Sequence, residues 1–116
     1  MPLVRLETTE QLVPESKARL IVELSRICAE TIGKPESYVM VVVADGLAMV
    51  HAGKPGPTAF IDIRSIGGLS ADVNLKLSER LCALLTKTTR VPADRIYLNF
   101  TSIEATHWGH DGGTFG

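Results

Sequence analysis

The sequence predicts an α+β fold, in which a β-α-β unit occurs twice and forms one four-stranded mixed sheet with two helices on one face. Each half of the chain has a strand pattern, an amphipathic helix pattern and a second strand pattern, in that order. The halves, about residues 2–44 and 59–101, align without a gap at a constant offset of 57 residues, as between positions 3 and 60. Right-handed crossovers then place both helices on the same side of the sheet. We expect residues 1–116 to form a single domain.

The first half has clear boundary signals. Residues 3–6 are a short strand candidate, and Pro14 favours the first turn of the helix that follows. Gly33 ends this helix, two residues before a proline that cannot continue it. Residues 38–44 are apolar at nearly every position, which predicts a strand buried on both faces.

The second half repeats these signals after a connecting segment. Residues 47–51 are a candidate short edge strand, and glycines and prolines indicate a loop at residues 52–57. Residues 60–63 are a strand, Ser70 begins the second helix, and residues 96–100 are the last strand. The matched positions include apolar helix residues and the proline after each helix: Leu20 with Leu77, Leu24 with Leu81, Ile27 with Leu84, Cys28 with Leu85, and Pro35 with Pro92.

One face of such a sheet has no covering layer. Both helices lie on the same face, whereas residues 38–44 carry apolar side chains on both faces. The pattern therefore predicts a symmetric homo-oligomer in which the bare sheets of several copies pack together.

Composition argues against several classes of function. The net charge of −1 gives no reason to expect nucleic acid or an anionic membrane as a partner. No apolar run approaches the roughly 18 residues that cross a bilayer, and no signal peptide is recognisable, so a cytoplasmic location is expected. Cys28 and Cys82 fall on predicted buried helix faces, which indicates reduced core thiols rather than a disulfide.

The N-terminus is a candidate catalytic group. Met1 precedes a small residue and is normally removed, which gives Pro2 a free secondary amine with an ordinary pKa of roughly 8. Burial at the start of a strand lowers the pKa of such an amine, so that it can act as a general base at neutral pH. The alternative is that Pro2 merely follows the initiator methionine and has no role.

Three further residues are candidates for binding. Asn99 occupies the position that Val42 holds in the first half, and a buried amide needs a hydrogen-bond partner, which a pocket or a subunit interface would provide. Tyr97 likewise replaces Met40. Lys34 either faces solvent at the end of the first helix or binds a substrate carboxylate. A metal site at His107, His110 and Asp111 is not expected, because no further residue has suitable ligand spacing.

Five motifs occur in one order along essentially the whole chain. They are Pro2 at the processed N-terminus, Gly33-Lys34-Pro35 with Tyr38, Ser65-Ile66-Gly67, Asp94-Arg95-Ile96-Tyr97-Leu98-Asn99, and Thr114-Phe115. Together they resemble the macrophage migration inhibitory factor family of the tautomerase superfamily. The resemblance implies a homotrimer whose sheets enclose a central channel, in agreement with the duplication and the bare sheet face.

The resemblance also implies an activity, that of a keto-enol tautomerase acting on phenylpyruvate-like or dopachrome-like compounds. Pro2 would be the base, while Lys34 and the backbone N–H of Ile66 would hold the carboxylate or oxygen of the substrate. Asn99 of a neighbouring subunit would hydrogen-bond the other end, beside Tyr97. The implied partners are a small keto or enol acid and other copies of the chain, and no metal or organic cofactor is needed.

The sequence departs from the mammalian cytokine at three places. Residues 58–61 lack its Cys-x-x-Cys pair, so a thiol oxidoreductase activity is not supported. His110 stands where the cytokine has a pocket tryptophan and Trp108 where it has a valine, which affects substrate preference. Arg64 stands in place of a histidine.

Two other functions stay open at this point. One is a cytokine-like protein-binding module with an inactive pocket, for which the sequence specifies no receptor. Related cytokines leave the cell without a signal peptide, so secretion is compatible with this sequence. The other is a decarboxylase or dehalogenase, which would need additional arginines to bind carboxylates.

Overall fold

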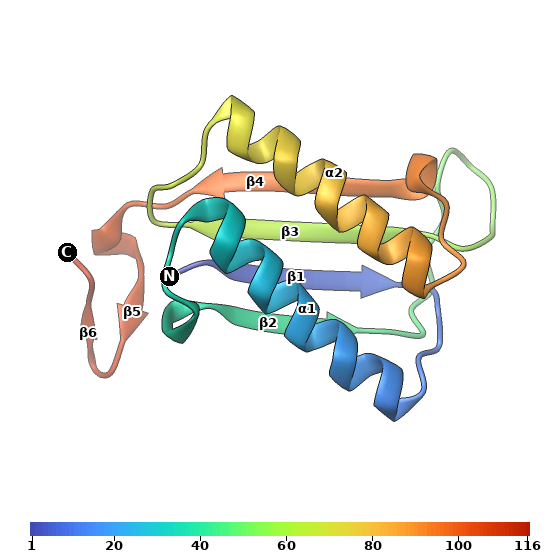
Figure 1. Cartoon of the computed structure of the whole chain (residues 1–116), viewed down its shortest axis with the longest axis horizontal. Coiled ribbons are helices and arrows are strands. Elements are labelled where there is room, and N and C mark those ends of the chain that lie inside the picture. The colour runs from blue at the N-terminus through green and yellow to red at the C-terminus, as the bar shows by residue number, and fades with distance from the viewer.

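The main sheet has four strands in the order β2-β1-β3-β4 (Figure 1). The computed structural model describes residues 1–116. β1 (Leu3–Thr8) and β3 (Ala59–Ser65) are the central antiparallel pair. β2 (Met40–Ala44) lies parallel to β1, and β4 (Ile96–Ser102) lies parallel to β3. The predicted mixed sheet of four strands is confirmed.

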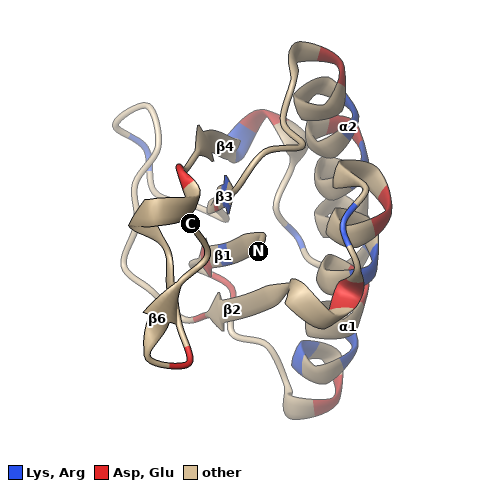
Figure 2. Ribbon diagram, turned by 90° about the vertical axis from the view of Figure 1, so that its left-hand side faces the viewer, with Lys and Arg blue, Asp and Glu red and all other residues tan.

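Both helices cover the same face of this sheet (Figure 2). α1 (Pro14–Ile32) connects β1 to β2, and α2 (Ala71–Thr88) connects β3 to β4. The core lies between the helices and the inward side chains of the strands. Its helix residues occupy most of the predicted positions, and they include Leu20, Leu24, Ile27 and Cys28 of α1 and Leu77, Leu81 and Leu85 of α2.

The two halves form the same unit because their apolar patterns and the proline after each helix recur at the same offset, although the helix caps differ. The helices begin 57 residues apart, at Pro14 and Ala71, and short 3-10 turns follow at the same offset, at Glu36–Tyr38 and Ala93–Arg95. Gly33 adopts the left-handed conformation, with φ of 80°, and its N–H donates to the carbonyl of Ala29, as expected for a helix end. The duplicated β-α-β unit is therefore confirmed.

Ser70 caps the N-terminus of the second helix, as its position in the sequence predicted. The Ser70 hydroxyl accepts a hydrogen bond from the N–H of Val73 at 3.2 Å, which satisfies one of the free donors of the first turn.

The prediction of a strand buried on both faces at residues 38–44 is wrong for the single chain. β2 begins only at Met40, which is 64% exposed, and the residues after it are half-buried. β2 is an edge strand with one neighbour, and no layer of the chain covers its outer face along the strand. The apolar residues of β2 therefore lie partly on a surface that no other element of the chain covers.

The predicted edge strand at residues 47–51 is also wrong. This segment contains only an isolated antiparallel bridge between His51 and Lys54. The Arg95 side chain binds the end of this segment and the loop after it, because it donates hydrogen bonds to the carbonyls of His51, Lys54 and Pro57 at 3.4, 2.9 and 2.8 Å.

The open face of the sheet carries charges in its central strands. Alternation along the strands places the side chains of Arg5, Asp62 and Asn99 on this face, in one row with Val42. Asn99 is exposed, so the expectation of an amide in a buried strand is wrong for the single chain. The open face is thus apolar at the β2 edge and polar towards β4, and self-association through it stays a prediction.

The C-terminal segment forms a small hairpin on the side of the sheet opposite the helices (Figure 2). Its strands are β5 (Gly109–His110) and β6 (Gly113–Thr114), joined by a turn in which Asp111 and Gly112 have φ of 50° and 78°. Neither this segment nor any other contains a helix with the length and apolar character required to span a membrane.

Candidate functional site

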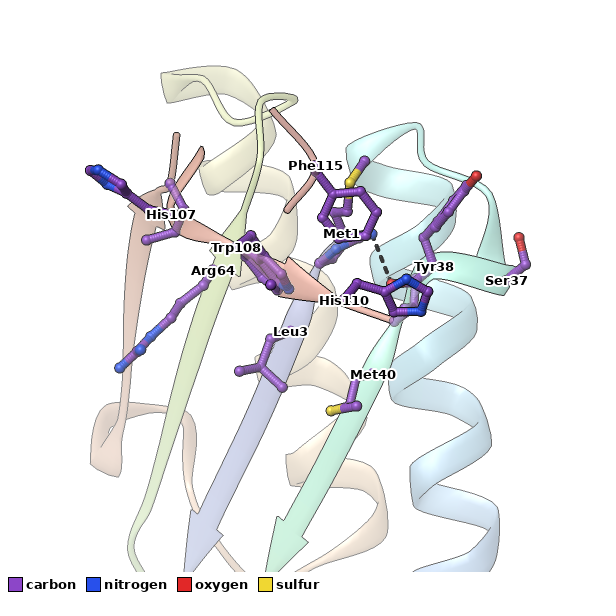
Figure 3. Close-up of a pocket in the computed structure, with 14 residues that line it drawn as sticks. Met1, Leu3, Ser37, Tyr38, Met40, Arg64, His107, Trp108, His110 and Phe115 are labelled. Atoms are coloured by element: carbon purple, nitrogen blue, oxygen red, sulfur yellow. Dashed lines mark hydrogen bonds between the residues drawn. The ribbon is translucent and has the colours of Figure 1, made fainter. Parts of the chain in front are cut away.

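A pocket of about 560 Å³ lies at the N-terminal end of β1 (Figure 3). Its walls come from the start of β1, the turn before β2, the end of β3 and the C-terminal hairpin. The lining residues are Met1, Pro2, Leu3, Ser37, Tyr38, Val39, Met40, Arg64, Ile103, His107, Trp108, Gly109, His110 and Phe115.

Pro2 is fixed at this pocket by backbone pairing. Its side chain is buried, and its carbonyl accepts a hydrogen bond from the N–H of Met40 at 3.0 Å. The amine of Met1 donates a hydrogen bond to the carbonyl of Tyr38 at 2.8 Å. Burial, followed by the positive charge of Lys34, lowers the pKa of this amine below its usual value of 8.0. A terminal amine at this end of β1 is thus shifted towards its uncharged form.

An aromatic cluster forms one wall of the pocket. The rings of Tyr38 and Phe115 meet edge to face, with centroids 6.5 Å apart. The ring of His110 stacks on the ring of Phe115, with centroids 5.4 Å apart and an interplanar angle of 17°. Trp108 lies across the pocket from this cluster (Figure 3).

Two distant segments supply these rings. Tyr38 ends the 3-10 turn that follows Pro35, whereas Phe115 belongs to the C-terminal tail. The tail is held in place because the N–H of Phe115 donates to the carbonyl of Trp108 at 3.1 Å. The wall therefore exists only when the tail folds against the end of the sheet.

Lys34 and Ile66 lie beside the pocket and do not line it. The ammonium nitrogen of Lys34 lies 3.8 Å from the point that a Cβ on Gly67 would occupy, so this lysine lies over the turn that contains Ile66. Gly67 and Gly68 both have positive φ, and a Cβ on Gly68 would lie 2.6 Å from a methyl carbon of Ile32. The N–H of Ile66 donates to no backbone acceptor in the chain.

Tyr97 and Asn99 lie elsewhere in the single chain. They belong to β4, the edge strand farthest from β2, where Asn99 aligns with Asp62 and Tyr97 with Phe60. The ring of Tyr97 packs against His51, with centroids 4.7 Å apart. Of the five predicted site residues, one chain brings only Pro2 into the pocket wall.

Sequence reasoning missed most of the wall. Tyr38 and Phe115 appeared only as motif residues, and Met40 and His107 were not predicted to meet at a pocket. The available signal was the concentration of histidine and aromatic residues in a short glycine-containing tail. Aromatic and histidine side chains offer both apolar surface and polar groups, as the lining of a ligand pocket does.

The arrangement has the chemical properties of a small-molecule site. The pocket volume lies in the range typical of ligand pockets, and eight of its 14 lining residues are hydrophobic. Aromatic side chains offer a stacking surface for a planar group, and a terminal amine with a lowered pKa nearby offers a base.

Comparison with known proteins gives one consistent result. The family model described as "Macrophage migration inhibitory factor (MIF)" matches residues 1–116. A macrophage migration inhibitory factor homolog of Brugia malayi is 35% identical over 118 residues and covers 100% of both chains. The factor of Meriones unguiculatus is 34% identical over 99% of this chain and 97% of its own.

Solved structures agree with the sequence comparison. The macrophage migration inhibitory factor-like protein of Entamoeba histolytica superimposes with a TM-score of 0.93 at 36% identity and 98% coverage of both chains. The homologue from Prochlorococcus marinus superimposes with a TM-score of 0.92, also at 36% identity, over 98% of this chain and 99% of its own.

Proposed function

Because this chain belongs to the macrophage migration inhibitory factor family, within the tautomerase superfamily, we propose that it is a keto-enol tautomerase. The proposed substrates are phenylpyruvate-like or dopachrome-like acids. The observation that carries the proposal is the position of Pro2, which is buried at the floor of a largely apolar pocket under conditions that disfavour a charged amine.

Removal of Met1 is the condition for this chemistry. With Met1 in place, the nitrogen of Pro2 is an amide and cannot accept a proton. Met1 itself lines the pocket, so its removal both exposes the amine of Pro2 and enlarges the space beside it. Burial and Lys34 lower the pKa of the Met1 amine. We infer that both act in the same direction on the Pro2 nitrogen once it is the terminal amine, because it is the adjacent residue.

The proton transfer follows from these neighbours. The uncharged amine of Pro2 removes a proton from the carbon beside the substrate carbonyl, and the protonated amine then delivers a proton to the carbonyl oxygen, which gives the enol. In the reverse direction the amine takes the enol O–H proton and delivers a proton to the carbon. Lys34 and the free N–H of Ile66 would bind the carboxylate or the oxygen on which negative charge develops. Both groups lie next to the turn that holds Gly67, on the side of the pocket towards the helices.

A neighbouring copy of the chain would complete the site. Asn99 and Tyr97 are exposed on the far edge strand, and β2 at the near edge also has a free side. Docking of the β4 edge of one copy near the β2 edge of the next would bring both residues to the pocket and cover the open sheet face. We therefore propose a homotrimer. Light scattering tests it, and a monomer at micromolar concentration would contradict it.

A decarboxylase or dehalogenase has less support. Arg64 is the only arginine in the pocket wall, and its guanidinium is paired with Asp62 at 3.1 Å. In Figure 3 its side chain extends along β3, away from Met1. It is thus not presented to a substrate carboxylate at Pro2.

The test is an enol-keto assay on phenylpyruvate with three preparations. These are the protein without Met1, verified by intact mass, the Pro2→Gly variant, and a preparation that retains Met1. Retention of Met1 removes the base and should reduce kcat/KM by about 100-fold or more, the usual contribution of general base catalysis. Pro2→Gly replaces the rigid secondary amine by a primary amine and should also lower the rate. Equal rates in all three would refute the assignment of Pro2.

A further inference from the structure

We propose that His110 determines specificity by binding a carboxylate at the end of the substrate remote from the reacting carbon. The preferred substrates would then be 2-oxo acids that carry a second carboxylate, such as arylpyruvates with an acidic ring substituent. The inference rests on the proposed function, which identifies the pocket as the substrate site, and it names the substrate class of that site.

The first support is the way His110 is held. Its imidazole stacks on Phe115 at a centroid distance of 5.4 Å. Neither ring nitrogen of His110 makes a hydrogen bond within the chain. Figure 3 places this imidazole between Phe115, Tyr38 and Met40, facing the pocket. A ring that is oriented by stacking and has free nitrogens can donate a hydrogen bond to a ligand at little cost in side-chain entropy.

The second support is the charge of the lining. No aspartate or glutamate is among the 14 lining residues, and the side chains with hydrogen-bonding groups are Ser37, Tyr38, Arg64, His107, Trp108 and His110. Arg64 is already paired with Asp62. In Figure 3 the ring of His107 points away from Tyr38 and Phe115. The hydroxyls of Ser37 and Tyr38 also point away from Met1 in Figure 3. His110 is therefore the ionisable side chain that faces the aromatic rings without an ion-pair partner, and an anionic group there would meet no carboxylate of the lining.

The third support is the placement of Lys34 and His110 on opposite sides of Pro2. Lys34 follows α1 and lies over the turn at Gly67, on the helix side of the sheet. His110 belongs to the hairpin on the other side of the sheet (Figure 2). A ligand whose first carboxylate lies towards Lys34 has its far end towards His110. A ligand with an apolar far end would stack on the rings and leave the imidazole without a partner.

The test compares the binding of hydrocinnamate and of its para-carboxy derivative, which cannot tautomerise. Calorimetric titration of the full chain without Met1 gives both Kd values. Trp108 is the single tryptophan and lines the pocket, so its emission reports whether the ligand binds there. The dicarboxylate should bind about 10-fold more tightly, the effect expected of one charge-assisted hydrogen bond.

His110→Phe should keep the stack and abolish this preference, whereas His110→Gln, which keeps a donor, should retain part of it. His107→Phe is the matched control and should keep the wild-type ratio. A wild-type protein without the preference, or an unchanged ratio in His110→Phe, would overturn the inference.

The binding test does not depend on turnover. A Pro2-dependent enzyme that shows no preference for the dicarboxylate would overturn this inference alone. An inactive protein with a His110-dependent preference would refute the proposed catalysis and leave the anion subsite established.

Discussion

The side chain of Arg95, directly before β4, binds the segment that connects the two halves of the chain. Its guanidinium donates to the carbonyl of Pro57 at 2.8 Å, to the carbonyl of Lys54 at 2.9 Å and to the hydroxyl of Thr58 at 2.8 Å. A longer contact reaches the carbonyl of His51 at 3.4 Å. Replacing Arg95 by alanine leaves these acceptors without their charged donor, although water reaches the more exposed ones.

The expected cost follows from these contacts. A hydrogen bond to a charged group contributes about 1.5–3 kcal/mol when it is well shielded from water. Three short bonds on a half-buried guanidinium should together contribute about 2–3 kcal/mol, since water replaces part of each. For a chain of this size, such a loss lowers Tm by about 10 °C. Arg95→Lys should recover only part of it, because an ammonium lacks the planar fork that reaches several carbonyls at once.

Urea denaturation at one fixed protein concentration measures this change, and the fixed concentration matters because association would add to the apparent stability. Arg26→Ala is the matched control, because Arg26 forms exposed ion pairs with Glu23 and Glu30 on the surface of α1, and such pairs contribute little. An Arg95→Ala variant as stable as Arg26→Ala would show that solvent replaces the guanidinium fully and would refute the reasoning.

Two further predictions concern titratable groups. Burial raises the pKa of the Cys28 thiol to about 12, against a smaller opposing effect of Arg80, so Cys28 should resist alkylation at pH 8 until the protein is unfolded. Cys82 is half-buried and should react first, which peptide mass spectrometry would show; equal labelling of both thiols would contradict the burial argument. Hydrogen bonds from Lys17 and from the N–H of Leu12 lower the pKa of Asp45 below its usual 3.8. The stabilising contribution of Asp45 should be present above pH 3.8 and be lost as the pH falls through its lower pKa in the folded state. Asp45→Asn should therefore make the free energy of unfolding less dependent on pH in this acidic range. An unchanged acid-unfolding curve would refute this role.

Most of the fold could be predicted because its signals are local. Pro14, Gly33 and Ser70 lie at or next to helix ends, and the same patterns recur 57 residues later, so two units could be recognised without any long-range information. The prediction that self-association covers the open face rests on the same patterns. It stays a prediction, and the charged side chains of Arg5 and Asp62 show that the open face is not uniformly apolar.

The two wrong strand predictions share a cause. An apolar run predicts burial, but it does not reveal whether the covering surface belongs to the same chain, and β2 is an edge strand. Residues 47–51 have suitable composition for a strand, yet their backbone has no neighbouring strand to pair with, and Arg95 binds the carbonyl groups of this loop instead. Both outcomes depend on which segments become neighbours, and single-segment patterns do not contain that information.

The sequence by itself determined the duplicated unit and the helix boundaries, because each element follows from a local pattern of residues, and it made Pro2 a candidate base. Only the tertiary structure decided that Tyr38, His110 and Phe115 meet around Pro2, and that one copy leaves Asn99 far from it. The physical reason is that a pocket is made where sheet edges, turns and the folded tail converge. Those contacts are set by the packing of whole elements and not by the order of residues within any one of them.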